Sequence, residues 1–225
     1  MATELNTQEK SLTDVIRERR ATNHFKPDPI PVGDLDRILQ AGLEAPSGYN
    51  LQPWRFVVVR GESQKKKLKE AAMNQPKVGE APVVIVACGD TKCWQGADLD
   101  EVFRLAAEHG YGGPDQHAAA KRNIAGFLGG TPGDAGGIAP DIGVWVNRHV
   151  MIAFTHMMLM AETLGYDTAP MEGFYENRIR ETLDIPAHVR VVALLAIGRR
   201  EGEDKPYGGR FPRARTVFFD RWDGR

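Results

Sequence analysis

The chain has 225 residues, of which 26% are charged, and its formal net charge is -1 at pH 7. This balance argues against electrostatic binding of nucleic acid, and no polybasic segment marks a membrane-binding surface. The length predicts one large domain, or two at most, whose core needs neither disulfides nor a structural metal.

The cysteines and the N-terminal segment favour a reducing, cytoplasmic location. Cys88 and Cys93 are too few for a zinc quartet or a disulfide framework. Residues 1–10 are polar and lack the apolar stretch of a signal peptide. The most apolar segment, residues 150–161, is too short to cross a bilayer, so we expect no membrane-spanning part.

The first 90 residues predict alternating helices and strands. Apolar spacing predicts helices over residues 11–20, which open with the capping-box-like S-L-T-D, over 35–43 and over 63–73. Strands are expected over 55–60 and over 81–88, and the second is apolar throughout, as in a strand buried on both faces. Residues 74–80 are expected to form a polar loop.

The rest of the chain contains a less regular segment and then a long apolar helix. Residues 99–106 and 117–128 suggest two helices, followed by a glycine-rich segment, 129–137, that is either a mobile lid over a pocket or a surface excursion. Residues 141–166 predict a helix that is apolar nearly all round and therefore buried in a core or an oligomer interface. A second polar loop (167–174), a helix (175–183), a buried strand (189–197) and a basic, irregular tail from residue 199 complete the pattern.

No catalytic or metal-binding motif stands out. His149 and His156 share one face of the long helix, but no carboxylate or cysteine stands at ligand spacing, so core or interface roles are favoured over a metal site. Glu172 lacks a second carboxylate for acid–base hydrolysis. No glycine-rich phosphate motif follows a strand, and no nucleophilic serine motif occurs.

The segment 45–56, A-P-S-G-Y-N-L-Q-P-W-R-F, is the most unusual connection in the chain. It is either a polar loop with Trp54 packed beneath it or a rigid loop that recognises a flat polar ligand. Arginines near both ends of the chain, carboxamides and glycine-containing loops form a set that could hold a planar, phosphorylated cofactor.

Several separated pieces of the chain resemble the FMN-dependent nitroreductase family. They are R-R-A-T-N-H-F at 19–25, the segment 45–56, N-Q-P-K at 74–77, G-Y-D-T-A-P-M-E-G-F at 165–174 and P-R-A-R at 212–215. The resemblance implies an α+β fold, with a mixed β-sheet flanked by helices in an intertwined homodimer that holds FMN at its interface. It also implies a single domain over 1–225, with 91–140 as a variable or lid insertion and 199–225 as a C-terminal extension.

The resemblance also implies which residues contact the flavin. The first segment contributes Arg19, Arg20, Ala21 and Asn23; the loop from the partner subunit contributes Pro46, Ser47, Gly48 and Asn50; and the remaining contacts are Asn74, Lys77, Pro170, Met171, Glu172, Gly173, Arg213 and Arg215. Backbone N–H groups of Glu172 and Gly173 are expected near flavin N5 and O4, and Arg213 and Arg215 near the phosphate. Trp54 is expected to anchor its loop by packing.

Three positions depart from the family pattern. The family usually has serine where Ala21 stands and lysine or arginine where Asn23 stands, and often has a second serine where Gly48 stands. Asn23 matters most, because it leaves Lys77 as the cation near the pyrimidine edge. A lower reduction potential of the flavin is therefore expected.

The mechanism implied by the resemblance has two half-reactions and needs no catalytic side chain. NADH or NADPH passes a hydride to the flavin and leaves, and a nitroaromatic, a quinone or a similar small aromatic acceptor then takes two electrons. Other native reactions in the same family, such as ene reduction, dehalogenation or flavin-consuming oxygenation, stay open, as does a non-enzymatic flavin-binding role.

Overall fold

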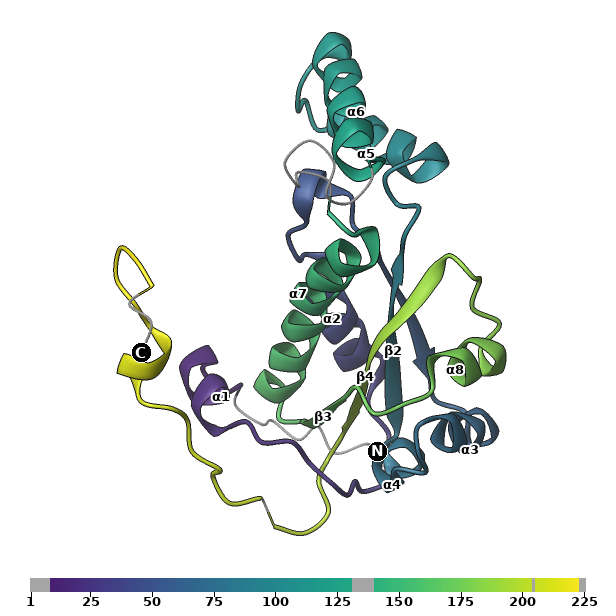
Figure 1. Cartoon of the computed structure of the whole chain (residues 1–225). Helices are drawn as coiled ribbons and strands as arrows, with labels where there is room; N and C mark the ends of the chain where they lie inside the picture. The colour runs from purple at the N-terminus through teal and green to yellow at the C-terminus, as the bar shows by residue number, and fades with distance from the viewer. Residues whose placement is uncertain (1–8, 131–139, 204, 223–225) are drawn as a thin grey trace.

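A four-stranded sheet is the framework of the fold (Figure 1). The computed structural model describes residues 9–130, 140–203 and 205–222. The strands are β1 (Trp54–Val59), β2 (Val83–Asp90), β3 (Asp167–Met171) and β4 (Val189–Gly198), in the spatial order β1-β2-β4-β3. All three neighbouring pairs are antiparallel. In the described residues the only parallel pairing is an isolated bridge between Ala21 and Thr168. The α+β class is confirmed, whereas the sheet predicted as mixed is antiparallel in all its strand pairs within the described chain.

The two central strands separate the core into two layers. All eight residues of β2 are buried, as the continuous apolar run predicts for a strand covered on both faces. Because side chains alternate along a strand, Val83, Ile85 and Ala87 join one apolar cluster and the intervening residues join the other.

Helices cover both faces of the sheet (Figure 1). The first face is covered by α2 (Val32–Leu43) and α7 (Ile142–Thr163), and the second by α3 (Glu62–Ala71), α4 (Pro76–Glu80) and α8 (Glu176–Thr182). The other helices are α1 (Leu12–Glu18), α5 (Gly96–Glu108), α6 (Pro114–Leu128), the single turn α9 (Arg213–Thr216) and the 3-10 turn η1 (Gly48–Asn50).

Capping and burial explain where two of these helices begin and how they pack. The side chains of Ser11 and Asp141 accept hydrogen bonds from backbone N–H groups of Asp14 and Val144, which fixes the starts of α1 and α7. Helix α7 is the most apolar of the set and packs one side against α2 and the sheet, while Val144 and Ile152 are exposed, so its predicted burial is only partly met within the chain.

Two predicted loops are wrong. Residues 74–80 contain α4, whose first position is Pro76, a residue that is preorganised for a helix start. Residues 167–171 form strand β3, which the sequence pattern does not predict because Asp167 and Thr168 are polar. Thr168 is buried and donates to Glu162, and Pro170 is tolerated because β3 lies at the edge of the sheet.

Two parts of the structure extend beyond the sheet. The α5–α6 hairpin projects from one end of the sheet, and the C-terminal tail runs out as an arm that ends near α9 (Figure 1).

Of the predicted loop 129–137, residues 131–137 lie outside the described residues. In the described part of the chain, no helix has both the length and the hydropathy needed to cross a bilayer.

Candidate functional site

The edge strand β3 brings the first predicted cofactor segment into place. Ala21 forms a bridge with Thr168, and the backbone N–H of Thr22 donates to the carbonyl of Thr168 at 3.0 Å. The segment from Arg19 to Asn23 therefore runs beside β3, with the side chain of Asn23 exposed.

A second contact joins the 74–77 segment to the loop after β3. The Gln75 Nε2 donates to the carbonyl of Gly173 at 2.8 Å, across 98 residues of sequence. Asn74 adopts a left-handed φ of 56° and its N–H donates to the carbonyl of Lys69 at 2.9 Å, which turns the chain toward this loop. Asn74, Glu172 and Gly173 are exposed around the contact, whereas Met171 is buried.

Arg19–Asn23 and Asn74–Lys77 thus each meet β3 or the loop that follows it, and together with Pro170–Gly173 they are called the β3-edge group below. These are three of the five segments that the sequence predicts as cofactor contacts. Gln75 was not predicted, although a second carboxamide beside Asn74 was a signal that could have found it.

The charges of the β3-edge group suit a phosphorylated, planar cofactor. The Nη1 atom of Arg19 is buried and has no hydrogen-bond partner in the described part of the chain. Partial burial and, second, the nearby Lys205 lower the pKa of Lys77. A buried donor without a partner and a destabilised cation both gain from an anionic or electron-rich group, so the residues present fit FMN.

Arg20, a predicted flavin contact, binds other parts of its own chain. Its Nη1 donates to the carbonyls of Arg17 and Arg19 at 2.9 and 2.8 Å. Its guanidinium lies over the ring of Tyr207, 4.6 Å from the ring centre. Arg20 therefore links the end of α1 to the C-terminal tail.

A buried carboxyl group lies behind Arg19. Glu162 accepts a hydrogen bond from Thr168 Oγ1 at 2.6 Å and lines a polar cavity together with Arg19 and Asp167. Burial above all, and the neighbouring Asp167, raise the pKa of Glu162 to about 7, although Thr168, Arg19 and Lys10 favour the charged form. This carboxyl group is therefore close to half-protonated at neutral pH.

The predicted loop residues Pro46, Ser47, Gly48 and Asn50 lie elsewhere. A Cβ at Gly48 would stand 3.0 Å from Trp145 Cζ2 and 3.3 Å from His149 Nε2, so this loop packs on the N-terminal part of α7. The β3 strand follows the C-terminal end of the same helix, which is about 33 Å long for its 22 residues. Within one chain this loop and the β3-edge group do not meet.

The loop itself is rigidly built. Tyr49, Asn50 and Gln52 have positive φ values of 54°, 56° and 45°. The hydroxyl of Ser47 accepts the backbone N–H of Gln52 at 2.9 Å, and Trp54 is 4% exposed beneath the loop. The expectation that Trp54 anchors the loop by packing is confirmed by this burial.

The two predicted phosphate residues, Arg213 and Arg215, lie on α9 in the projecting arm. Both are exposed, and their guanidinium groups stack on Phe219 and Phe211 of the same arm. The arm that carries them extends away from the sheet (Figure 1).

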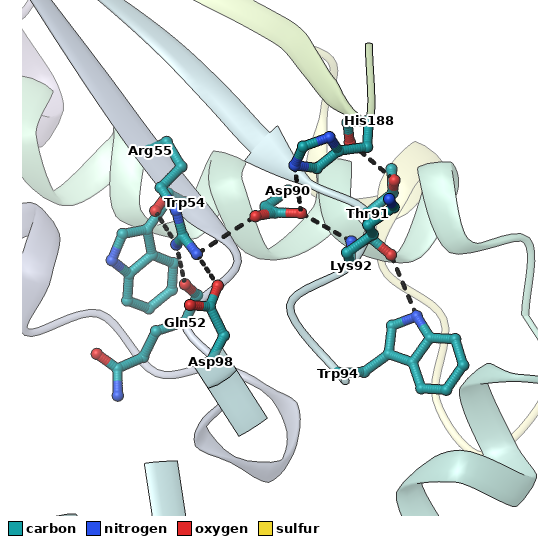
Figure 2. A network of polar contacts seen from close by, with 9 residues as sticks. All are labelled: Gln52, Trp54, Arg55, Asp90, Thr91, Lys92, Trp94, Asp98 and His188. Carbon is teal, nitrogen blue, oxygen red and sulfur yellow. Dashed lines mark hydrogen bonds and ion pairs between the residues drawn. The ribbon is translucent and has the colours of Figure 1, made fainter. Parts of the chain in front are cut away.

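A polar network behind the loop was not predicted (Figure 2). Arg55 Nη1 donates to the carbonyls of Gln52 and Trp54 at 3.1 and 2.9 Å, and its Nη2 pairs with Asp90 and Asp98. Asp90 is 8% exposed and also accepts the backbone N–H of Lys92. The sequence predicts Arg55 only as a strand residue, because its partners lie 35 and 43 residues further along the chain.

The histidines and cysteines have structural surroundings. Nδ1 of His149 is 2.8 Å from the carbonyl of Trp145, and Nδ1 of His156 is 3.2 Å from the carbonyl of Ala41. Among the described residues, no group of three or more potential ligands could hold a metal ion. Burial raises the pKa of Cys88 and of Cys93 to about 12, so neither thiol is a reactive nucleophile at neutral pH.

Comparison with known proteins gives one consistent relationship. The sequence profile of the Nitroreductase family matches residues 16–199. A protein of Thermus thermophilus named NADH dehydrogenase is 37% identical over 90% of this chain and 92% of its own length. MhqN of Bacillus subtilis, whose name assigns it to the NAD(P)H nitroreductases, is 30% identical over 89% of this chain and 94% of its own. A solved structure from Exiguobacterium sibiricum that holds FMN is 25% identical, with a TM-score of 0.82, and covers 95% of this chain and 99% of that one.

Proposed function

The chain belongs to the nitroreductase family, and we propose that it reduces nitroaromatics, quinones or related acceptors by ping-pong transfer of two electrons. It is an NAD(P)H-dependent oxidoreductase with FMN as its cofactor. FMN, when bound, carries the electrons between the nicotinamide and the acceptor. The protein therefore needs to bind and orient these molecules rather than to supply a nucleophile or an acid–base pair.

The observation that carries the proposal is the assembly of the β3-edge group from three distant segments. Arg19 offers a buried donor without a protein partner, Asn74 a carboxamide, and Lys77 a cation that is partly withdrawn from water. Together they would hold the cofactor by its polar edge, with the loop of Glu172 and Gly173 beside it. Lys77 would stabilise the negative charge that the ring gains on reduction.

The positions of the remaining predicted contacts support a homodimer with shared sites. The loop 46–50 does not reach the β3-edge group of its own chain, and Arg213 and Arg215 stack on aromatic rings of their own arm rather than on this group. A second subunit could bring them there. Leu12 and Ile16 on α1 are 58% and 63% exposed, which leaves an apolar surface that such a partner would cover.

The test begins with the purified protein and its spectrum. We expect a yellow protein that releases FMN on denaturation and is bleached anaerobically by NADH or NADPH. Double-reciprocal plots against a nitroaromatic or a quinone should give parallel lines. A colourless protein that does not take up FMN would falsify the proposal, and intersecting lines would exclude the ping-pong order.

A further inference from the structure

One cavity lies next to residues 46–52, the predicted flavin contact from the partner subunit and its continuation, called the flavin loop below. Its walls come from two separate parts of the chain. It has a volume of about 590 Å3. Tyr49 and Asn50 of the loop form one wall, and mostly apolar side chains of the α5–α6 hairpin, such as Phe103 and Ile124, form the other. The distance between these walls decides how large a molecule can lie against the loop.

Arg55 connects the two walls (Figure 2). On one side it donates to the carbonyl of Gln52, whose own N–H is held by the Ser47 hydroxyl at 2.9 Å. On the other side it pairs with Asp98, in the first turn of α5. One guanidinium group therefore links the flavin loop to the hairpin.

This link has no polar substitute in the described residues. Across 9–130, 140–203 and 205–222, the Arg55–Asp98 pair is the only hydrogen bond or ion pair between the α5–α6 hairpin and the sheet. The other ion pairs of the hairpin, those of Arg104 and Lys121, are internal to it. The other contacts between the hairpin and the body are apolar: Ile124 and Leu128 join the first core cluster, and the Phe127 ring meets that of Tyr49 at 6.1 Å between centres.

Contacts other than the one with Asp98 already hold the guanidinium of Arg55 in place. Two backbone carbonyls and the buried carboxylate of Asp90 fix Arg55, so little side-chain freedom is lost when Asp98 pairs with it. Asp98 is therefore the less restrained member of the pair, and it lies in the first turn of α5.

We propose that Arg55 and Asp98 are a positioning pair that holds the α5–α6 hairpin against the flavin loop and thereby limits the size of the acceptor. The proposal rests on the proposed function, since the cavity matters as an acceptor site only beside a bound flavin. Neither residue need touch the substrate or the cofactor.

The test uses Asp98→Ala rather than a change of Arg55. Removing Arg55 would leave Asp90 buried without its cation and could unfold the site. The holoenzyme is assayed with p-benzoquinone and with the larger phenanthrenequinone, and amide hydrogen exchange is measured over α5 and α6. In the variant, kcat/KM for the larger quinone should rise about threefold relative to the smaller one, the size of effect a partly exposed pair can supply. The change should be in KM, and exchange in the hairpin should be faster.

The matched control is Asp115→Ala. Asp115 lies in the first turn of α6, so this variant loses the same kind of helix-end charge without breaking a link to the sheet. The control should keep the wild-type ratio and exchange rates, and Asp98→Asn should fall between Asp98→Ala and wild type. An unchanged quinone ratio in Asp98→Ala overturns the proposal, whatever the exchange shows. If the wild type reduces neither quinone, the proposed function fails instead. In that case, unchanged hydrogen exchange over α5 and α6 in Asp98→Ala would by itself refute the role of the Arg55–Asp98 pair.

Discussion

Asn23 is an exposed amide at a position where the family usually carries a cation. Lys77 is then the remaining predicted cation at the pyrimidine edge, and burial with the nearby Lys205 already lowers its pKa. Asn23→Arg should raise the reduction potential of the bound flavin, because a second positive charge favours the reduced, anionic ring. A redox titration against a reference dye measures this, with Asn23→Gln as the neutral control. An unchanged potential in Asn23→Arg would show that position 23 does not act on the flavin.

Glu162 gives the protein a pH-dependent stability. Its folded-state pKa is about 7, above the ordinary 4.5, chiefly because of burial. Between these values the native state holds a proton that the unfolded state has lost, so stability decreases as pH rises from about 4.5 to 7. Glu162→Gln keeps an acceptor for Thr168 and should remove this loss, gaining up to about 3 kcal/mol above pH 7 and almost nothing at pH 4.5. Urea unfolding of both proteins at the two pH values checks it, and equal differences at both would contradict it.

At the scale of elements, the close approach of α7 to β2 depends on Gly89. A Cβ at this position would lie 2.2 Å from Val146 Cγ1 and 3.1 Å from Val150 Cγ2. Gly89→Ala should therefore force the helix and the strand apart and destabilise the protein by about 1–3 kcal/mol. Gly61→Ala is the control, since a Cβ there meets nothing within 4 Å. Thermal unfolding of the two variants should differ clearly, and equal midpoints would show that α7 shifts without strain.

The elements also show where local pattern succeeds and where it fails. Strands β2 and β4 were predictable because their apolar runs are mostly buried, and helix α7 because its apolar run is long. Strand β3 was not, because it is short, begins with polar residues and contains Pro170. Its strand state depends on pairing with β4, whose residues 194–198 are far away in sequence.

At the scale of the whole molecule, the projecting arm should be needed for cofactor binding. It carries Arg213 and Arg215 and exposes Phe219 and Trp222 by 72% and 74%. Deleting residues 209–225 should weaken both dimerisation and FMN affinity. Arg213→Ala with Arg215→Ala should leave the dimer intact and lower FMN affinity by at least about tenfold for each lost charged hydrogen bond. Light scattering and fluorescence titration separate the two effects, and a truncated monomer with wild-type affinity would refute a shared site.

The sequence by itself determined the fold class, the long buried helix and, through the five separated pieces, the family and its cofactor. Those features depend on residue type and local spacing. Only the tertiary structure decided that Arg19–Asn23 and Asn74–Lys77 both meet β3 or the loop after it, because contacts such as Gln75 to Gly173 span 98 residues. It also decided that segment 45–56, one loop in sequence, is linked through Arg55 to α5. An ion pair depends on where two side chains meet in space, and no local pattern of apolar and polar residues encodes that meeting.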